Sequence, residues 1–200
     1  MYRIERILYR KADITVSLVE KGYKYMCKKG LDYKKFRYIP NGIDFEEFLR
    51  RNEPLPSEHE QILQTYRAQG KFIVGYAGYL GKMNALEILI DAFFILHRKG
   101  ETDIQLVLVG KGEFASYLQA KVEKLGLINV KFLPPVKWAQ IPNLLRHFDI
   151  GYIGTNLLIH RLYGVNYIKI YEYMATGIPI LYAIDSSCLL YTSPSPRDRG

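Results

Sequence analysis

Short apolar runs alternate with amphipathic segments throughout the second half of the chain, and this alternation constrains the fold more than any other feature. Strands are expected at 72–76, 104–109, 129–133 and 149–153 and from residue 178, with helices at 84–98, 113–125, 138–147 and just before Gly177. Apolar runs of this length, separated by helical patterns, indicate strands that are buried on both faces and joined by crossover helices. The pattern therefore predicts an α/β fold with a Rossmann-like parallel sheet.

The first part of the chain has a similar but shorter pattern. Helices are expected at 3–11 and 20–29, and strands at 13–19 and 35–39. A Pro-Asn-Gly turn closes this part at residue 42, and the polar segment that follows contains two prolines and a helical stretch at 57–68. We therefore predict a first domain over 1–42, a connection over 43–70 and the Rossmann-like domain over 71–187.

The end of the chain does not continue this pattern. Residues Cys188 to Asp198 read as the in-frame translation of a common transposase-based sequencing adapter. We interpret 188–200 as a non-native, adapter-derived tail and exclude it from the fold. The natural gene is then expected to have been cut near Ser187.

Composition excludes several classes of protein. Hydrophobic residues make up 48% of the chain and charged residues 24%, which is ordinary for a globular protein. No apolar stretch approaches the roughly 20 residues of a membrane span, and the basic start lacks the apolar region of a signal peptide. Two cysteines form no disulfide framework and no metal-site spacing. We expect a cytoplasmic protein without a metal or a cofactor.

Positive charge is concentrated at the start of the chain. The net charge is +8, and residues 1–40 contribute +7 of it. Their basic residues lie at helical spacing beside Ile4, Ile7 and Leu8, a pattern compatible with an anionic membrane surface and equally with a solvated helix face. No nucleic-acid-binding motif accompanies the charge, so we expect no nucleic acid partner.

Lys169 and Glu172 are the strongest candidates for a functional site. They lie three residues apart and therefore share one face of a helix. Gly177 and Pro179 are expected to end this helix, and the apolar run that follows predicts a buried strand. In open α/β sheets ligands bind at such helix–strand edges, although a surface ion pair is the alternative explanation.

Three loops could bring backbone amides to an anion. Gly78 and Lys82 follow the strand at 72–76, Gly110 and Gly112 follow the strand at 104–109, and Gly164, Val165 and Asn166 precede the helix of Lys169. Glycines allow backbone amides to approach a diphosphate, and a helix N-terminus attracts an anion. Each loop alone is also compatible with an ordinary tight turn, but together they predict a nucleoside-diphosphate site.

Other site chemistries fit less well. A dinucleotide site should have an acidic residue at the end of its second strand, but this strand ends at Val109-Gly110-Lys111. An NAD-dependent oxidoreductase is therefore disfavoured. No Ser/His/Asp set, no paired catalytic carboxylates and no His/Cys cluster are apparent in the sequence, so the catalytic residues stay unassigned.

The ordered motifs resemble those of a known family, the retaining glycosyltransferases of family four, which have the GT-B fold. The resemblance covers about residues 1–185 and is closest to bacterial enzymes of O-antigen, capsule and exopolysaccharide assembly. The matching motifs are Ile39-Pro-Asn-Gly-Ile-Asp44 with Phe48, Val74-Gly-Tyr-Ala-Gly78, Leu108-Val-Gly-Lys-Gly112, Asn129-Val-Lys-Phe-Leu133, Ile141-Pro-Asn-Leu-Leu145 with Asp149, and Lys169-Ile-Tyr-Glu-Tyr-Met-Ala-Thr-Gly-Ile-Pro179.

The resemblance implies roles for the candidate residues. Glu172 would accept hydrogen bonds from the ribose hydroxyls, and Lys169 would lie near the diphosphate or the sugar. Lys82 would meet the phosphates, and the amides of Gly78 and of residues 164–166 would approach the donor. Two positions depart from the family pattern, because Gly164 and Tyr79 stand where many members have Glu and Arg.

The resemblance also implies a function. The chain would be the donor-binding half of an enzyme that transfers a sugar, with retention, from a UDP- or GDP-sugar to a lipid-linked or saccharide acceptor. Residues 1–42 would be a remnant of the acceptor-binding domain, and this piece alone is expected to be inactive. The alternatives are a non-catalytic nucleotide-binding subunit that needs a separate acceptor-domain partner and, with less support, the oxidoreductase.

Overall fold

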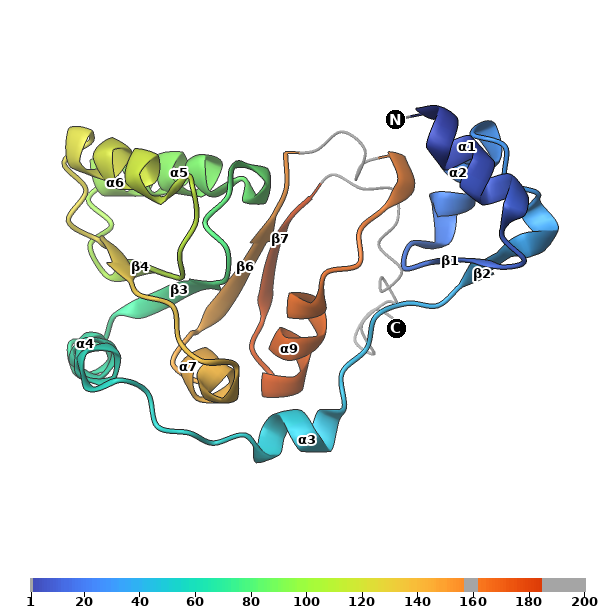
Figure 1. Cartoon of the computed structure of the whole chain (residues 1–200). Helices are drawn as coiled ribbons and strands as arrows, with labels where there is room; N and C mark the ends of the chain where they lie inside the picture. The colour runs from blue at the N-terminus through green and yellow to red at the C-terminus, as the bar shows by residue number, and fades with distance from the viewer. Residues whose placement is uncertain (1, 157–161, 185–200) are drawn as a thin grey trace, which may run out of the picture. The chain divides into compact units, whose positions relative to one another are not determined.

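The computed structural model describes residues 2–156 and 162–184. Contacts within the chain define two compact units (Figure 1). Unit 1 comprises Met1–Asn41, Leu157–Tyr167 and Ile184–Gly200, and unit 2 comprises Gly42–Asn156 and Ile168–Ala183. The predicted tail at 188–200 lies outside the described residues.

Unit 2 contains a five-stranded sheet in which every strand pair is parallel. Its strands are β3 (Phe72–Ala77), β4 (Ile104–Val109), β5 (Val130–Leu133), β6 (Ile150–Gly154) and β7 (Ile180–Ala183), in the spatial order β5-β4-β3-β6-β7. The predicted α/β class and parallel sheet are thus confirmed. The chain winds outward from β3 to β5 and then returns to the other side of β3, so the winding direction reverses between β3 and β6. In open α/β folds ligands bind at this switch point.

Helices cover both faces of the sheet (Figure 1). One face carries α5 (Leu86–Arg98) and α6 (Ala115–Lys124), and the other carries α4 (Ser57–Ala68), α7 (Ile141–Leu145) and α9 (Ile168–Thr176). The apolar core beneath α5 and α6 includes Tyr76, Leu106 and Leu108, all almost fully buried. Both faces of β3 and β4 are therefore withdrawn from water, as their continuous apolar sequences predicted.

A short helix, α3 (Phe45–Arg50), was not predicted. Asp44 caps its N-terminus, because the Asp44 carboxylate accepts a hydrogen bond of 2.8 Å from the backbone amide of Glu47. Phe48 anchors the helix, with only 1% of its surface exposed. The surrounding sequence is polar, so a single buried aromatic residue gave too weak a periodic signal to indicate a helix.

Unit 1 contains α1 (Tyr2–Lys11), β1 (Thr15–Ser17), α2 (Tyr23–Lys28) and β2 (Phe36–Tyr38), and its two strands pair in parallel. Asn166 belongs to this unit. The side-chain amide of Asn166 donates a 2.9 Å hydrogen bond to the backbone carbonyl of Leu18, and the backbone carbonyl of Asn166 accepts one of the same length from the side chain of Asn41. Among the described helices of both units, none combines the length and the apolar character needed to cross a bilayer.

The contact of Gly75 with Phe148 generates a stability prediction. A Cβ at position 75 would overlap the ring of Phe148, a side chain that is 2% exposed and cannot move aside. Gly75→Ala should therefore lower the free energy of unfolding by about 1–3 kcal/mol in urea denaturation. The matched control is Gly42→Ala, because a Cβ there meets no atom within 4 Å. Equal stability of the two variants would contradict this packing of β3.

Candidate functional site

Lys169 lies over the carboxyl end of β3, at the switch point of the sheet. Its Nζ donates a 2.9 Å hydrogen bond to the hydroxyl of Tyr76 and lies 4.2 Å from the centroid of that ring. A Cβ at position 78 would lie 2.6 Å from both Cε and Nζ of Lys169. Gly78 also has a φ of +147°, which side chains disfavour. Two independent features therefore require glycine beneath the Lys169 ammonium group.

Burial perturbs this ammonium group strongly. Desolvation lowers the pKa of Lys169 from 10.5 to about 8, although the nearby charge of Glu172 acts in the opposite direction. Most molecules therefore carry the positive charge at neutral pH, but without a full hydration shell. Such a poorly solvated cation gains more from an incoming anion than an exposed lysine does.

Glu172 lies one turn further along α9 and is partly buried. Burial raises the pKa of its carboxyl group, and the positive charges of Lys169 and Arg51 oppose that rise. The predicted Lys169 and Glu172 pair is thus brought together on one helix. Arg51 was not predicted to act on Glu172, because it lies more than a hundred residues before Glu172 in the sequence, at the end of the unpredicted helix α3.

The two glycine-rich loops after β3 and β4 pack tightly on each other. The backbone amide of Gly78 donates to the carbonyl of Val109, at 2.9 Å, and the amide of Leu80 donates to that of Lys111, at 2.8 Å. A Cβ at position 110 would overlap the carbonyl oxygen of Gly78, and one at Gly112 would overlap that of Leu80. At these two glycines the loop after β4 approaches the loop after β3, and this packing forms the edge of the site.

A mostly apolar pocket of about 240 Å³ opens beside these loops. Its walls are Ala77–Tyr79, Val109–Lys111, Pro135, Val136 and Ile141. They come from the carboxyl ends of β3 and β4 and from the segment that follows β5. Pro135, Val136 and Ile141 were not among the predicted site residues, although Ile141 begins one of the motifs that carry the family resemblance.

The remaining predicted residues lie in both units. Lys82 is exposed in a 3-10 turn, η3 (Lys82–Asn84), and its carbonyl accepts a 2.9 Å hydrogen bond from Asn156. Gly164, Val165 and Asn166 belong to unit 1. The nine predicted residues are therefore divided between the units, with Gly78, Lys82, Gly110, Gly112, Lys169 and Glu172 in unit 2.

Within residues 2–156 and 162–184, no group of three His, Cys, Asp or Glu side chains is arranged to hold a metal ion. The positive charges that act on the Glu172 carboxyl group are instead those of Lys169 and Arg51. The arrangement combines a desolvated cation, a partly buried carboxylate and an adjacent apolar pocket. It is suited to a ligand that carries a negative charge, hydroxyl groups and a flat apolar part.

Residues 58–188 match the model of the family described as glycosyl transferases group 1. The chain belongs to this family. It has no match among curated protein sequences. The family match covers β3 to β7 and both residues of the Lys169 and Glu172 pair.

Solved structures of glycosyltransferases share the fold. Anabaena Alr3699/HepE in complex with UDP-glucose is 22% identical with a TM-score of 0.71, and the alignment covers 92% of this chain and 49% of that one. A Rickettsia africae glycosyltransferase is 14% identical with a TM-score of 0.68, over 90% and 47%. WaaG, a glycosyltransferase involved in lipopolysaccharide biosynthesis, is 18% identical with a TM-score of 0.64, over 88% and 45%.

These structures are GT-B glycosyltransferases, so the fold of the chain resembles GT-B, as predicted. The chain spans about half the length of each of the three. At these identities the likeness concerns the fold, and it does not transfer a substrate.

The lowered pKa of Lys169 predicts a pH-dependent contribution to stability. Its pKa is about 8 in the folded chain and 10.5 for a model lysine, so the unfolded state binds more protons between these values. The contribution of Lys169 to the free energy of unfolding should therefore rise from about pH 8 to about pH 10.5. Urea unfolding of the wild type and of Lys169→Met measures this as a stability difference that changes with pH.

The control for this prediction is Lys82→Met, which removes an exposed lysine. Titration of all other groups cancels when each variant is compared with the wild type at the same pH. A difference between the wild type and Lys169→Met that stays constant across the window would show that Lys169 is solvated in the folded protein.

Proposed function

We propose that unit 2 binds the nucleoside diphosphate of a sugar donor. The observation that carries this proposal is the desolvated ammonium group of Lys169, held over Gly78 at the switch point of the sheet. A buried cation beside a partly buried carboxylate is costly unless a ligand uses both groups. A nucleoside diphosphate does so, because it presents negative phosphates to a lysine and hydroxyl groups to a glutamate.

Each part of the ligand has a proposed partner. Lys169 lies near the diphosphate or the sugar, Glu172 accepts hydrogen bonds from the ribose hydroxyls, and the turn at Gly78 approaches the donor. The apolar pocket between Gly78, Val109 and Val136 is proposed to accept the flat base. We further propose that Lys82, Gly110, Gly112 and residues 164–166 contribute to the same site in the complete protein, as the family resemblance implies.

The proposed reaction is the transfer of a hexose to a lipid-linked or saccharide acceptor with retention of configuration, as in family four. The bond between the anomeric carbon and the diphosphate breaks, the acceptor oxygen bonds to that carbon, and its proton is released. Negative charge develops on the departing diphosphate. Lys169 is already positioned and desolvated, so it can stabilise this charge without reorganisation.

The similar structures support the choice of donor and pathway. Alr3699/HepE is in complex with UDP-glucose, and WaaG is involved in lipopolysaccharide biosynthesis. We therefore propose a UDP-sugar, with a GDP-sugar as the alternative, and a role in bacterial cell-surface polysaccharide biosynthesis at the inner face of the membrane.

Unit 1 carries features that favour a membrane surface. Ile4, Ile7 and Leu8 on α1 are each more than half exposed. A pocket of about 430 Å³ nearby in the same unit is lined by four basic side chains: Arg3, Arg6, Lys28 and Lys29. Apolar side chains next to basic ones are suited to anionic lipid headgroups. We propose that this surface docks the protein on an anionic membrane as a peripheral protein.

The membrane proposal predicts cosedimentation with vesicles. At low salt the full chain should bind vesicles that contain phosphatidylglycerol, because its positive charge is concentrated in unit 1. It should stay in solution when the vesicles contain only phosphatidylcholine. Replacing Arg3 and Arg6 by Gln should release it, whereas replacing Arg67 and Lys99 in unit 2 should not. Equal binding to both kinds of vesicle would contradict the proposal.

The nucleotide site predicts the effect of two substitutions. Lys169→Met and Glu172→Gln should each weaken the binding of UDP, or of GDP if that is the donor nucleotide, by about 1–3 kcal/mol in titration calorimetry. Each removes one partner of a charged hydrogen bond. Lys99→Met and Glu58→Gln are matched controls, because both residues are exposed.

Unchanged affinity in both site variants would refute the assignment. A thermal-shift response to NAD, with none to UDP or GDP, would instead favour the oxidoreductase. Nucleotide binding without sugar transfer, when the complete protein is assayed, would favour the non-catalytic subunit.

A further inference from the structure

Tyr76 joins the ammonium group of Lys169 to the loop that follows β3. Tyr76 is 1% exposed, and its hydroxyl oxygen lies 2.9 Å from Nζ of Lys169 and 2.8 Å from the backbone carbonyl oxygen of Tyr79. The side-chain amide of Asn84 donates to the same carbonyl, also at 2.8 Å. A continuous chain of hydrogen bonds therefore runs from Lys169 to the turn that begins at Gly78.

The direction of these hydrogen bonds fixes what the hydroxyl group offers to Lys169. A tyrosine hydroxyl has one proton, and a carbonyl oxygen can only accept. The proton of Tyr76 is therefore donated to Tyr79, and a lone pair of the hydroxyl oxygen faces Nζ of Lys169. Because this bond is stronger when its donor is charged, it stabilises the ammonium form of Lys169 more than the neutral amine.

The ring of Tyr76 supports the same ammonium group. Nζ of Lys169 lies 4.2 Å from the ring centroid, within the range of a cation–π contact. Gly78 leaves room for this position, since a Cβ there would lie 2.6 Å from Nζ. Tyr76 thus contacts the ammonium group with both its ring and its hydroxyl, and Tyr76→Phe removes only the second contact.

The other charged groups around α9 complete the surroundings of Lys169. Burial lowers the pKa of Lys169 to about 8, and the charge of Glu172 on the same helix opposes this change. The elements packed against α9 are α3, α7 and β6, of which α7 and β6 contain no charged residue. The charged residues in and directly after α3, and in the loop after β3, are Glu46, Glu47, Arg50, Arg51 and Lys82. The tyrosines in α9, in β6 and in that loop are Tyr171, Tyr173, Tyr152 and Tyr79.

We propose that Tyr76 is a positioning residue, whose hydroxyl group holds the ammonium group of Lys169 over Gly78 and favours its protonated form for the incoming diphosphate. This inference rests on the proposed function, because the diphosphate contact of Lys169 belongs to it. An apolar side chain at position 76 would leave the same buried amine without this acceptor, and more of it would be neutral near pH 8. A neutral amine offers no charge to the phosphates. The hydroxyl group of Tyr76 therefore extends the pH range in which the nucleotide binds.

The first test compares the pH dependence of UDP binding in the wild type and in Tyr76→Phe by titration calorimetry on the full chain, with GDP in its place if that is the donor nucleotide. Loss of a hydrogen bond to a charged group should shift the protonation of Lys169 by about tenfold. Binding should then weaken about fivefold at pH 8 but less than about twofold at pH 6, where Lys169 is protonated in both proteins. At pH 7 the variant should take up about 0.4 more protons per UDP than the wild type. Titration of the phosphates of UDP cancels in this comparison.

The matched control is Tyr152→Phe. Tyr152 lies on the neighbouring strand β6, is 2% exposed, and donates its hydroxyl proton to the carbonyl of Ala85 at 3.0 Å. The substitution removes an equivalent hydrogen bond to a backbone carbonyl, and it should leave the pH profile of UDP binding as in the wild type. If Tyr76→Phe follows the profile of this control at every pH, the inference is overturned.

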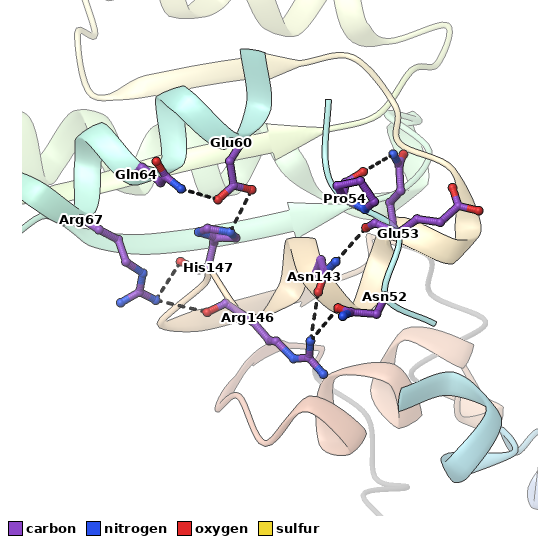
Figure 2. Close-up of polar contacts among 10 residues, drawn as sticks. Asn52, Glu53, Pro54, Glu60, Gln64, Arg67, Asn143, Arg146 and His147 are labelled. Carbon is purple, nitrogen blue, oxygen red and sulfur yellow. Dashed lines mark hydrogen bonds and ion pairs between the residues drawn. The ribbon is translucent and has the colours of Figure 1, made fainter. Parts of the chain in front are cut away.

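A second control separates positioning from a general loss of stability. Figure 2 shows a polar network around α7, in which Asn143 donates to the carbonyl of Glu53 at 2.7 Å and accepts from Arg146 at 2.9 Å. Asn143→Ala removes both hydrogen bonds, and it should lower the stability to urea without moving the pH profile of UDP binding. A profile that moves in Asn143→Ala as it does in Tyr76→Phe would also overturn the inference, because destabilisation alone would then explain the shift.

The last test needs neither the nucleotide nor a variant at position 76. If Nζ of Lys169 donates to the hydroxyl oxygen, loss of the lysine proton should move the ¹³Cζ resonance of Tyr76 in the wild type near pH 8. The ¹³Cζ resonance of Tyr152 is the internal control and should stay in place. A Tyr76 resonance that does not follow the titration of Lys169 overturns the inference, even if Tyr76→Phe does not fold.

Failure of the proposed function gives a different result. If the wild type binds neither UDP nor GDP, or if Lys169→Met binds the nucleotide as tightly as the wild type, the proposed function fails. The NMR titration still decides whether Tyr76 governs the protonation of Lys169, because it is recorded without a ligand.

Discussion

The contact of Lys169 with the carboxyl end of β3 is the interaction on which the site depends. It requires glycine at position 78, a tyrosine hydroxyl at position 76 and a helix that returns over the sheet at α9. The strand order supplies the last of these, because the sheet reverses its winding beside β3 and leaves that strand end open to the returning helix. The loops after β3 and β4, which are joined by backbone hydrogen bonds, form the wall of the site next to this contact.

Three ionisable groups share this partly buried region, and the two positive ones each favour the ionised form of Glu172. Burial disfavours the charged forms of Lys169 and Glu172, while each stabilises the charged form of its neighbour, and Arg51 adds a second positive charge beside Glu172. Groups in such surroundings rarely serve stability alone, since an apolar set of similar volume would pack at lower cost. The proposed ligand compensates both groups, because its phosphates meet Lys169 and its hydroxyl groups meet Glu172, and perturbed groups of this kind are a common property of functional sites.

Much of the fold could be predicted because its signals are local. The strand at 104–109 and the helix at 57–68 were predicted with the bounds that the structure has, from apolar runs and helical composition. The pairing of Lys169 with Glu172 on one face followed from helical spacing alone. Helix α3 and the position of Arg51 could not be predicted in this way, because they depend on the packing of α3 against α9 and of Arg51 over Trp138, far away in the sequence. Gly110 and Gly112 also approach the loop after β3, a contact between loops that their spacing in the sequence does not indicate.

Proton uptake on nucleotide binding tests the central claim most directly. If a diphosphate binds beside the desolvated Lys169, it raises the pKa of that lysine from about 8, and the complex must take up protons when it forms near pH 8. Calorimetric titration of UDP into the full chain, repeated in buffers with different ionisation enthalpies, counts these protons. The account predicts a net uptake that disappears in Lys169→Met. Binding with no proton uptake in the wild type would contradict it.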